Sequence, residues 1–154
     1  EVVWKGKGKG EMPDKTDGLH SIMPTPYIRD GHIYGVCSYG ELRCLKADTG
    51  VRIWETRKPT VGRPDDEGKP VRWGNAFLTP NEDKWFLFNE QGELIIARLS
   101  PQGYQELDRT LLLKPLNKMA GRPVVWSHPA YANKSIFVRN DEELIRVNLS
   151  AAGD

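Results

Sequence analysis

The sequence lacks the features that mark several classes of protein. It contains two cysteines in 154 residues, which provide neither a disulfide framework nor the spacing of a zinc site. No run of about 18 apolar residues occurs, so no membrane-spanning helix is predicted. The 22 basic and 21 acidic residues nearly cancel, and a net charge of +1 excludes a strongly basic nucleic-acid-binding domain. The chain starts at Glu1 without an initiator methionine or a signal peptide, which favours a processed or excised piece.

Turn-forming and aromatic residues are well represented. The 15 glycines and 11 prolines favour frequent turns and disfavour long helices. Five tryptophans, five tyrosines and four phenylalanines argue against disorder, because aromatic side chains supply much of the apolar area of a folded core. These proportions predict one folded domain built from short strands.

An internal repeat organises the chain. Residues 34–45, 86–97 and 136–147 each read as a strand, a tight turn and a second strand. The motif Gly40-Glu41-Leu42 recurs after 52 residues as Gly-Glu-Leu and after a further 50 as Glu-Glu-Leu. A repeat of about 50 residues built from short strands is typical of a β-propeller blade.

Further short strands are expected around each hairpin. One precedes each hairpin, at residues 23–28, 72–78 and 124–131, and one follows the first two, at 51–56 and 104–113. Residues 1–5 resemble another fourth strand, because Val3-Trp4 mirrors Ile53-Trp54. The sequence therefore predicts an all-β fold: a partial β-propeller of about three four-stranded antiparallel blades, cut within a blade at both ends.

The predicted boundaries describe one propeller segment over residues 1–154. Its parts are the last strand of a preceding blade (1–5), two blades (21–58 and 70–114) and an incomplete blade (123–149), joined by exposed linkers at 6–17, 59–69 and 115–122. Propellers usually close with four to eight blades, which favours a piece of a larger propeller over a three-bladed ring closed by residues 1–5. Residues 1–5 and 143–149 are expected to be exposed edge strands that invite pairing with another chain.

One segment carries a family resemblance. Residues 45–55, Leu-Lys-Ala-Asp-Thr-Gly-Val-Arg-Ile-Trp-Glu, resemble the blade signature Ala-x-Asp-x-x-Thr-Gly-x-x-x-Trp of the pyrroloquinoline-quinone-like (PQQ-like) propeller family. Thr49, Gly50 and Trp54 are in register, whereas Cys44 and Lys46 replace the usual Ala and Asp. Thr49-Gly50 suits a turn that needs a positive φ. We expect Trp54, and Trp4 by its likeness, to pack between neighbouring blades.

The resemblance implies a bacterial protein in the periplasm or otherwise outside the cytoplasm. It favours a non-catalytic scaffold or a protein- or ligand-binding module without a cofactor, whose partners are the remaining blades of a parent propeller and envelope proteins. The alternative is a fragment of a PQQ-dependent quinoprotein dehydrogenase. There, PQQ and calcium would lie over the channel against a tryptophan, mostly within blades outside this sequence.

Six residues are candidates for the central channel, because they take equivalent positions on one face of the predicted first strands. These are Met23, Trp73 and Trp126 and, two residues further along, Thr25, Asn75 and His128. They either contact a ligand or a water column, or pack between blades with their polar groups bonded to the backbone, which is the commoner arrangement.

Other chemistry has little support. His20 and His128 form a weak candidate metal pair without fixed spacing, so no metal site is predicted. Cys37 and Cys44 are expected on one face of the first hairpin, either as buried thiols or as a strand-crossing disulfide. No Gly-x-Ser-x-Gly motif occurs, and Glu142 and Glu143 should point to opposite faces of a strand. No catalytic residue is predicted.

Overall fold

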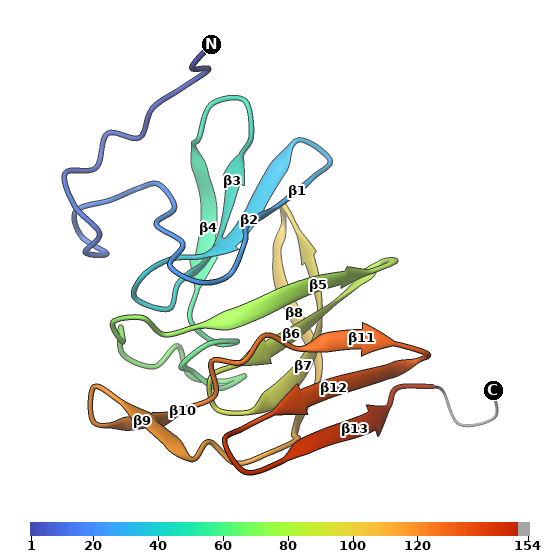
Figure 1. Ribbon diagram of the computed structural model, residues 1–154. Coiled ribbons are helices and arrows are strands. Elements are labelled where there is room, and N and C mark those ends of the chain that lie inside the picture. The colour runs from blue at the N-terminus through green and yellow to red at the C-terminus, as the bar shows by residue number, and fades with distance from the viewer. Residues whose placement is uncertain (151–154) are drawn as a thin grey trace.

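The computed structural model describes residues 1–150, which fold entirely into strands, turns and loops (Figure 1). Thirteen strands and no helix occur in this range. The prediction of an all-β fold with four-stranded antiparallel sheets is confirmed. None of the described residues forms an apolar helix long enough to cross a membrane.

The first sheet is an antiparallel meander. Its strands, in both chain and spatial order, are β1 (Tyr27–Arg29), β2 (His32–Val36), β3 (Leu42–Lys46) and β4 (Arg52–Thr56). Asp30 and Gly31, with φ of 50° and 72°, join β1 to β2, and two successive positive φ angles are what a two-residue hairpin turn requires. β2 and β3 pair from His32 opposite Lys46 to Val36 opposite Leu42, which confirms the hairpin predicted at residues 34–45.

The second sheet repeats this meander. It contains β5 (Ala76–Asn81), β6 (Lys84–Asn89), β7 (Glu93–Ser100) and β8 (Gly103–Leu111) in that order. The strand pairing is interrupted between Cys44 and Leu45 in the first sheet and between Ile96 and Ala97 in the second. These two β-bulges are 52 residues apart, the same offset as the Gly-Glu-Leu motif, so the repeat extends to local backbone geometry.

The third sheet has three strands within the described residues. They are β11 (Ala130–Ala132), β12 (Ser135–Arg139) and β13 (Leu144–Asn148), and β13 pairs with β12 alone. A separate hairpin of β9 (Asn117–Met119) and β10 (Arg122–Val124) precedes this sheet. It lies in a segment predicted to be a linker; Ala120 and Gly121, both with positive φ, form its turn.

The second sheet lies between the other two and contributes apolar side chains from both of its faces (Figure 1). One face packs against the first sheet, in a cluster that includes Trp85, Leu87 and Ile95 with Tyr34 and Leu42. The opposite face packs against the third sheet, in a cluster formed by Phe77, Phe88, Leu94, Leu113, Val125, Ile136 and Val138. Successive residues of β6 thus serve two different cores, because side chains alternate between the faces of a strand.

The first strand of each sheet begins later than predicted. β1 starts at Tyr27, β5 at Ala76 and β11 at Ala130. Proline at 24, 26 and 129 supplies no backbone N–H for a ladder. Trp73, with a φ of 63°, turns the chain just before β5. The upstream segments are therefore loops that lead into the sheets.

Residues 1–5 form no strand, contrary to the prediction. They lie in a segment without regular secondary structure, in which Val2 and Val3 are each 79 % exposed and Trp4 is half-buried. No neighbouring strand of the described chain offers them a ladder. Of the predicted edge strands, only the one within residues 143–149 is present, as β13.

Candidate functional site

Two tryptophans make the same contact in successive repeats. The Trp4 Nε1–H donates to the Ala47 carbonyl at 2.8 Å, and the Trp54 Nε1–H donates to the Ser100 carbonyl at 2.8 Å. Each accepting carbonyl lies three residues before the glycine of a turn, Gly50 or Gly103. We call this arrangement the indole–turn contact.

The indole–turn contact joins one repeat to the next. Trp54 lies on the last strand of the first sheet, and its acceptor belongs to the β7–β8 turn of the second sheet. Trp54 also packs against the cluster between these sheets, with its ring 6.2 Å from that of Tyr34. Trp4 takes the corresponding position relative to the first sheet, although its own segment is not a strand. Thr49, in the turn that Trp4 contacts, is exposed, and its Oγ1 accepts from Val51 N at 3.5 Å.

Three of the six channel candidates come together between the first and second sheets. Met23, Trp73 and Asn75 line a cavity with no room for a water molecule. Asn75 is 2 % exposed, and neither atom of its amide has a hydrogen-bond partner. Buried amides are normally paired, so this orphaned group is unusual. The cavity as it stands is too small for a ligand.

Trp73 and Trp126 are linked through a buried ion pair. Glu90, 3 % exposed, accepts two hydrogen bonds from Arg122, at 2.8 and 3.1 Å, and one from Trp126 Nε1 at 3.0 Å. Arg122 also donates to the carbonyl of Arg72 at 3.1 Å, and the Arg72 guanidinium lies 4.8 Å from the centre of the Trp73 ring. The two tryptophans thus belong to a cross-linked polar cluster that joins the segments before β5 and β11.

Thr25 and His128 do not line the cavity formed by Met23, Trp73 and Asn75, although the sequence places them in positions equivalent to Asn75. Thr25 is exposed, and the imidazole of His128 packs 4.6 Å from the ring of Phe77 with its Nδ1 2.9 Å from the Pro129 carbonyl. The Nε2 atom of His20 instead contacts Thr16 Oγ1 at 3.0 Å. Among residues 1–150, no three His, Cys, Asp or Glu side chains gather as a metal site.

The two cysteines are buried free thiols on opposite faces of the first sheet, not on one face as predicted. Cys44 lies opposite Tyr34 and faces the second sheet. Cys37 follows the end of β2, and its Sγ accepts from Arg43 Nη1 and from His20 N, each at 3.3 Å. Burial raises the pKa of the Cys44 thiol, which disfavours the reactive thiolate.

A buried polar network, not anticipated from the sequence, ties the linker at 59–69 to the second sheet. Arg109 donates to Glu93 at 2.9 Å, to Glu106 at 2.9 and 3.0 Å, and to the Lys58 carbonyl at 2.8 Å. Arg63 also pairs with Glu93, at 2.7 Å. Glu106 and Arg109 share a face, despite being three residues apart on a strand, because the bulge at Ile96/Ala97 shifts the alternation of β8.

The network perturbs the ionisation of Glu106. Burial alone would raise the pKa of this carboxyl, but hydrogen bonds from Arg109 and Tyr104 outweigh burial and hold the pKa below its usual range. The Glu106 carboxylate thus accepts from Arg109 through both of its oxygens and from the Tyr104 hydroxyl. The network therefore holds the linker at 59–69 against the second sheet.

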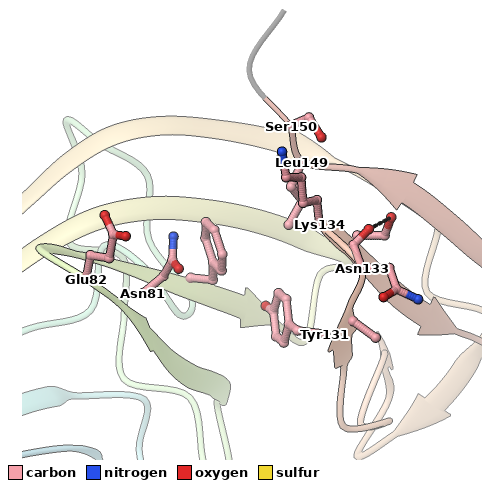
Figure 2. A pocket seen from close by; sticks show the side chains of 10 residues that line it. Asn81, Glu82, Tyr131, Asn133, Lys134, Leu149 and Ser150 are labelled. Carbon is pink, nitrogen blue, oxygen red and sulfur yellow. Dashed lines mark hydrogen bonds between the residues drawn. The ribbon is translucent and has the colours of Figure 1, made fainter. Parts of the chain in front are cut away.

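A cavity of about 570 Å³ lies between the ends of the second and third sheets (Figure 2). Asn81 and Glu82, from the β5–β6 turn, face Lys134, Leu149 and Ser150 across it, as Figure 2 shows. Its floor is formed by Phe86 and Tyr131, whose rings stack at 5.4 Å. The volume is within the range of ligand pockets, but the two aromatic faces are already in contact with each other.

A second, more apolar groove of about 250 Å³ continues from this cavity beside the C-terminal end of β13, at Val147 and Asn148. The two share Phe86, Leu149 and Ser150. The wall opposite β13 comes from β7, β8 and the segment after β8, through Leu94, Ile96, Asp108, Arg109, Thr110 and Leu112. The groove therefore runs beside the strand edge that has no partner within residues 1–150.

No protein-family model matches the chain, and no curated protein matches it.

Proposed function

We propose that the chain is a non-catalytic segment of a PQQ-like β-propeller, which serves as a rigid scaffold or as a module that binds proteins or ligands. The observation that carries this proposal is the indole–turn contact, made by Trp4 on Ala47 and by Trp54 on Ser100 at the same 2.8 Å. A contact that repeats between successive sheets is what a radial array of blades requires.

The layering of the sheets supports the same proposal. The second sheet is covered on both faces by its neighbours, as an internal blade of a propeller would be. The first and third sheets each have only one such neighbour among the described residues, so further blades are the natural partners. The resemblance also favours a place outside the cytoplasm and partners in the cell envelope.

The alternative, a quinoprotein dehydrogenase fragment, would need Trp73 or Trp126 to stack on PQQ with an acid nearby for the calcium ion. The Arg72 guanidinium lies over Trp73, and Trp126 is tied to Glu90. Glu90 is saturated by Arg122 and Trp126, and the Glu11 carboxylate is paired with Arg72 at 2.8 Å. Both carboxylates recorded in this cluster, Glu11 and Glu90, are thus already paired within the described part of the chain, so these residues do not fit a quinone with a calcium ion.

Isothermal titration calorimetry with PQQ and calcium tests the proposal. We expect no saturable heat for this chain. Saturable binding that Trp126→Ala abolishes and Trp54→Ala leaves intact would overturn the scaffold proposal, because Trp54 belongs to the contact between sheets and not to the Glu90 cluster. Binding that both variants retain would also contradict it and would locate the quinone elsewhere on the chain.

A stability measurement tests the propeller stacking itself. Trp54→Phe removes the indole donor while keeping an aromatic ring, and Trp126→Phe provides a matched control outside the contact. We expect Trp54→Phe to increase hydrogen exchange in β7 and β8 of the next sheet. An effect confined to β4 would show that the indole–turn contact does not couple the sheets.

A further inference from the structure

The open edge of β13 has a defined hydrogen-bonding pattern. Leu149 N donates to the Lys134 carbonyl at 2.7 Å, so alternate residues from Leu149 backwards bond to β12. The N–H groups of Leu144, Arg146 and Asn148 therefore point away from β12. They form a row of donors on an edge to which no other strand of the described chain is bonded.

A segment suited to this edge exists at the other end of the chain. Val2 and Val3 are 79 % exposed, in a segment outside any strand whose Trp4 is held by its indole–turn contact. Trp54, which makes the equivalent contact, lies on the fourth strand of its sheet. Residues 1–5 therefore occupy the position of a fourth strand but pair with no sheet of the described chain.

We propose that residues 1–5 of a second copy of this chain add to the edge of β13 and complete the third sheet as its fourth strand. In this arrangement Trp4 of the second copy keeps its contact with Ala47 of its own first sheet. The third sheet of one copy thus stacks on the first sheet of the next. The indole–turn contact, which already joins the first sheet to the second through Trp54, would then join the third sheet of one copy to the first sheet of the next through Trp4.

The groove beside β13 fits the side chains of that segment. With Trp4 facing its own first sheet, Val3 points to the opposite face of the added strand, because adjacent side chains alternate. That face looks into the groove of about 250 Å³, whose apolar lining comprises Phe86, Leu94, Ile96, Leu112, Val147 and Leu149. An exposed valine would be buried there, and the exposed N–H row would be paired.

The contact is head to tail, so it forms either a closed ring or an open filament. Two copies of the 154-residue chain would bring together six sheets of three or four strands, within the four to eight blades of closed propellers, whereas three copies would bring together nine. We therefore expect a closed dimer. The number of copies rests on the proposed propeller stacking, whereas the strand contact does not.

Analytical ultracentrifugation of the 154-residue chain over a wide concentration range provides the test. We expect a reversible species of twice the 17.5 kDa chain mass. Arg146→Pro removes one outward N–H while leaving the bonds to β12, and it should abolish the dimer. Arg146→Ala keeps that N–H and loses the same side chain, so it should still dimerise.

The donor segment is tested in the same way. A Val2→Pro/Val3→Pro double variant removes ladder donors from exposed residues and should be monomeric, whereas Lys7→Pro, outside the segment, should remain dimeric. Mixing the double variant with Arg146→Pro should restore a heterodimer, because one supplies an intact edge and the other an intact donor.

Three results would overturn the proposal. They are a strict monomer at all concentrations, a dimer that both proline variants retain, and open-ended assemblies in place of a dimer. The first two reject the strand contact and leave the scaffold proposal to be judged by the Trp54→Phe exchange experiment. The third rejects the two-copy ring.

Discussion

The indole of Trp4 lies over Gly50, in the space that a β-carbon at residue 50 would occupy. An ideal β-carbon there would approach three carbons of the ring to 2.5, 2.6 and 2.7 Å, well inside van der Waals contact. Gly50 also has a φ of 70°. The same turn therefore provides the Ala47 carbonyl, which accepts from the Trp4 indole, and a glycine without a β-carbon, against which the indole ring packs.

Gly50→Ala should release Trp4 from the first sheet. Gly31→Ala is the matched control, because Gly31 has a φ of 72° and open space around its β-position. Both substitutions incur the cost of a left-handed alanine, roughly 1–2 kcal/mol, and only Gly50→Ala adds the clash. We expect a red shift of tryptophan fluorescence in Gly50→Ala alone; equal spectra for the two variants would contradict the close contact.

Gly92→Ala should be among the most damaging single substitutions. A β-carbon at residue 92 would lie 2.0 Å from the Leu113 carbonyl oxygen, and Gly92 has a φ of 79°. Gly121→Ala is the matched control: Gly121 has a φ of 81° and no atom within 4 Å of its β-position, so an alanine there has the same backbone strain without a clash. Thermal unfolding should show a much larger decrease in Tm for Gly92→Ala than for Gly121→Ala. Similar decreases would show that the segment around Leu113 moves aside without a large cost in stability.

Arg109→Met should destabilise the chain by about 3–5 kcal/mol, because it leaves the buried Glu93 and Glu106 without their main cation. Arg98→Met is the control: Arg98 pairs with Asp83, and both side chains are about half exposed. Exposed pairs contribute roughly 0–1 kcal/mol. Urea unfolding measures both, and a small effect of Arg109→Met would mean that water replaces the guanidinium.

Tyr34 should cause a loss of stability at alkaline pH. Burial, followed by the neighbouring Cys44, raises the pKa of Tyr34 from 10.0 to about 12. Between these values the phenol ionises in the unfolded chain but stays neutral in the folded one, so ionisation favours unfolding. Stability should fall as pH rises through this window, and Tyr34→Phe should fall less steeply in urea titrations. Equal slopes would contradict the assignment.

The central hairpins could be predicted from the sequence because their signals are local. Alternating apolar residues around Gly40 and Gly92 gave strands and turns that match β2–β3 and β6–β7. The first strands were displaced because proline and a left-handed Trp73 override the apolar pattern before them. Cys37 was assigned to the wrong face because the register of the hairpin was not known: Cys44 pairs with Tyr34, so Cys37, three residues after Tyr34, lies on the opposite face.

The polar contacts could not be predicted, because they either join residues distant in sequence or depend on a β-bulge. Arg122 and Glu90 are 32 residues apart, and no spacing rule connects them. The contact between Glu106 and Arg109 depends on a bulge that changes which side chains share a face. Thr25, Asn75 and His128 looked equivalent by counting, but one is buried and two are exposed once the loops before each sheet take different paths.

The burial of the second sheet on both faces has a consequence for pairing errors. Where one face of a sheet meets water, sliding a strand by one residue exposes its apolar side chains and is penalised. In β6, Trp85 and Leu87 would merely exchange cores with Phe86 and Phe88. Polarity therefore cannot keep β6 in place, and its alignment depends on side-chain volumes and on the glycine turn at Gly92. Substitutions that equalise the sizes of these four residues should promote misaligned strands before they cause unfolding.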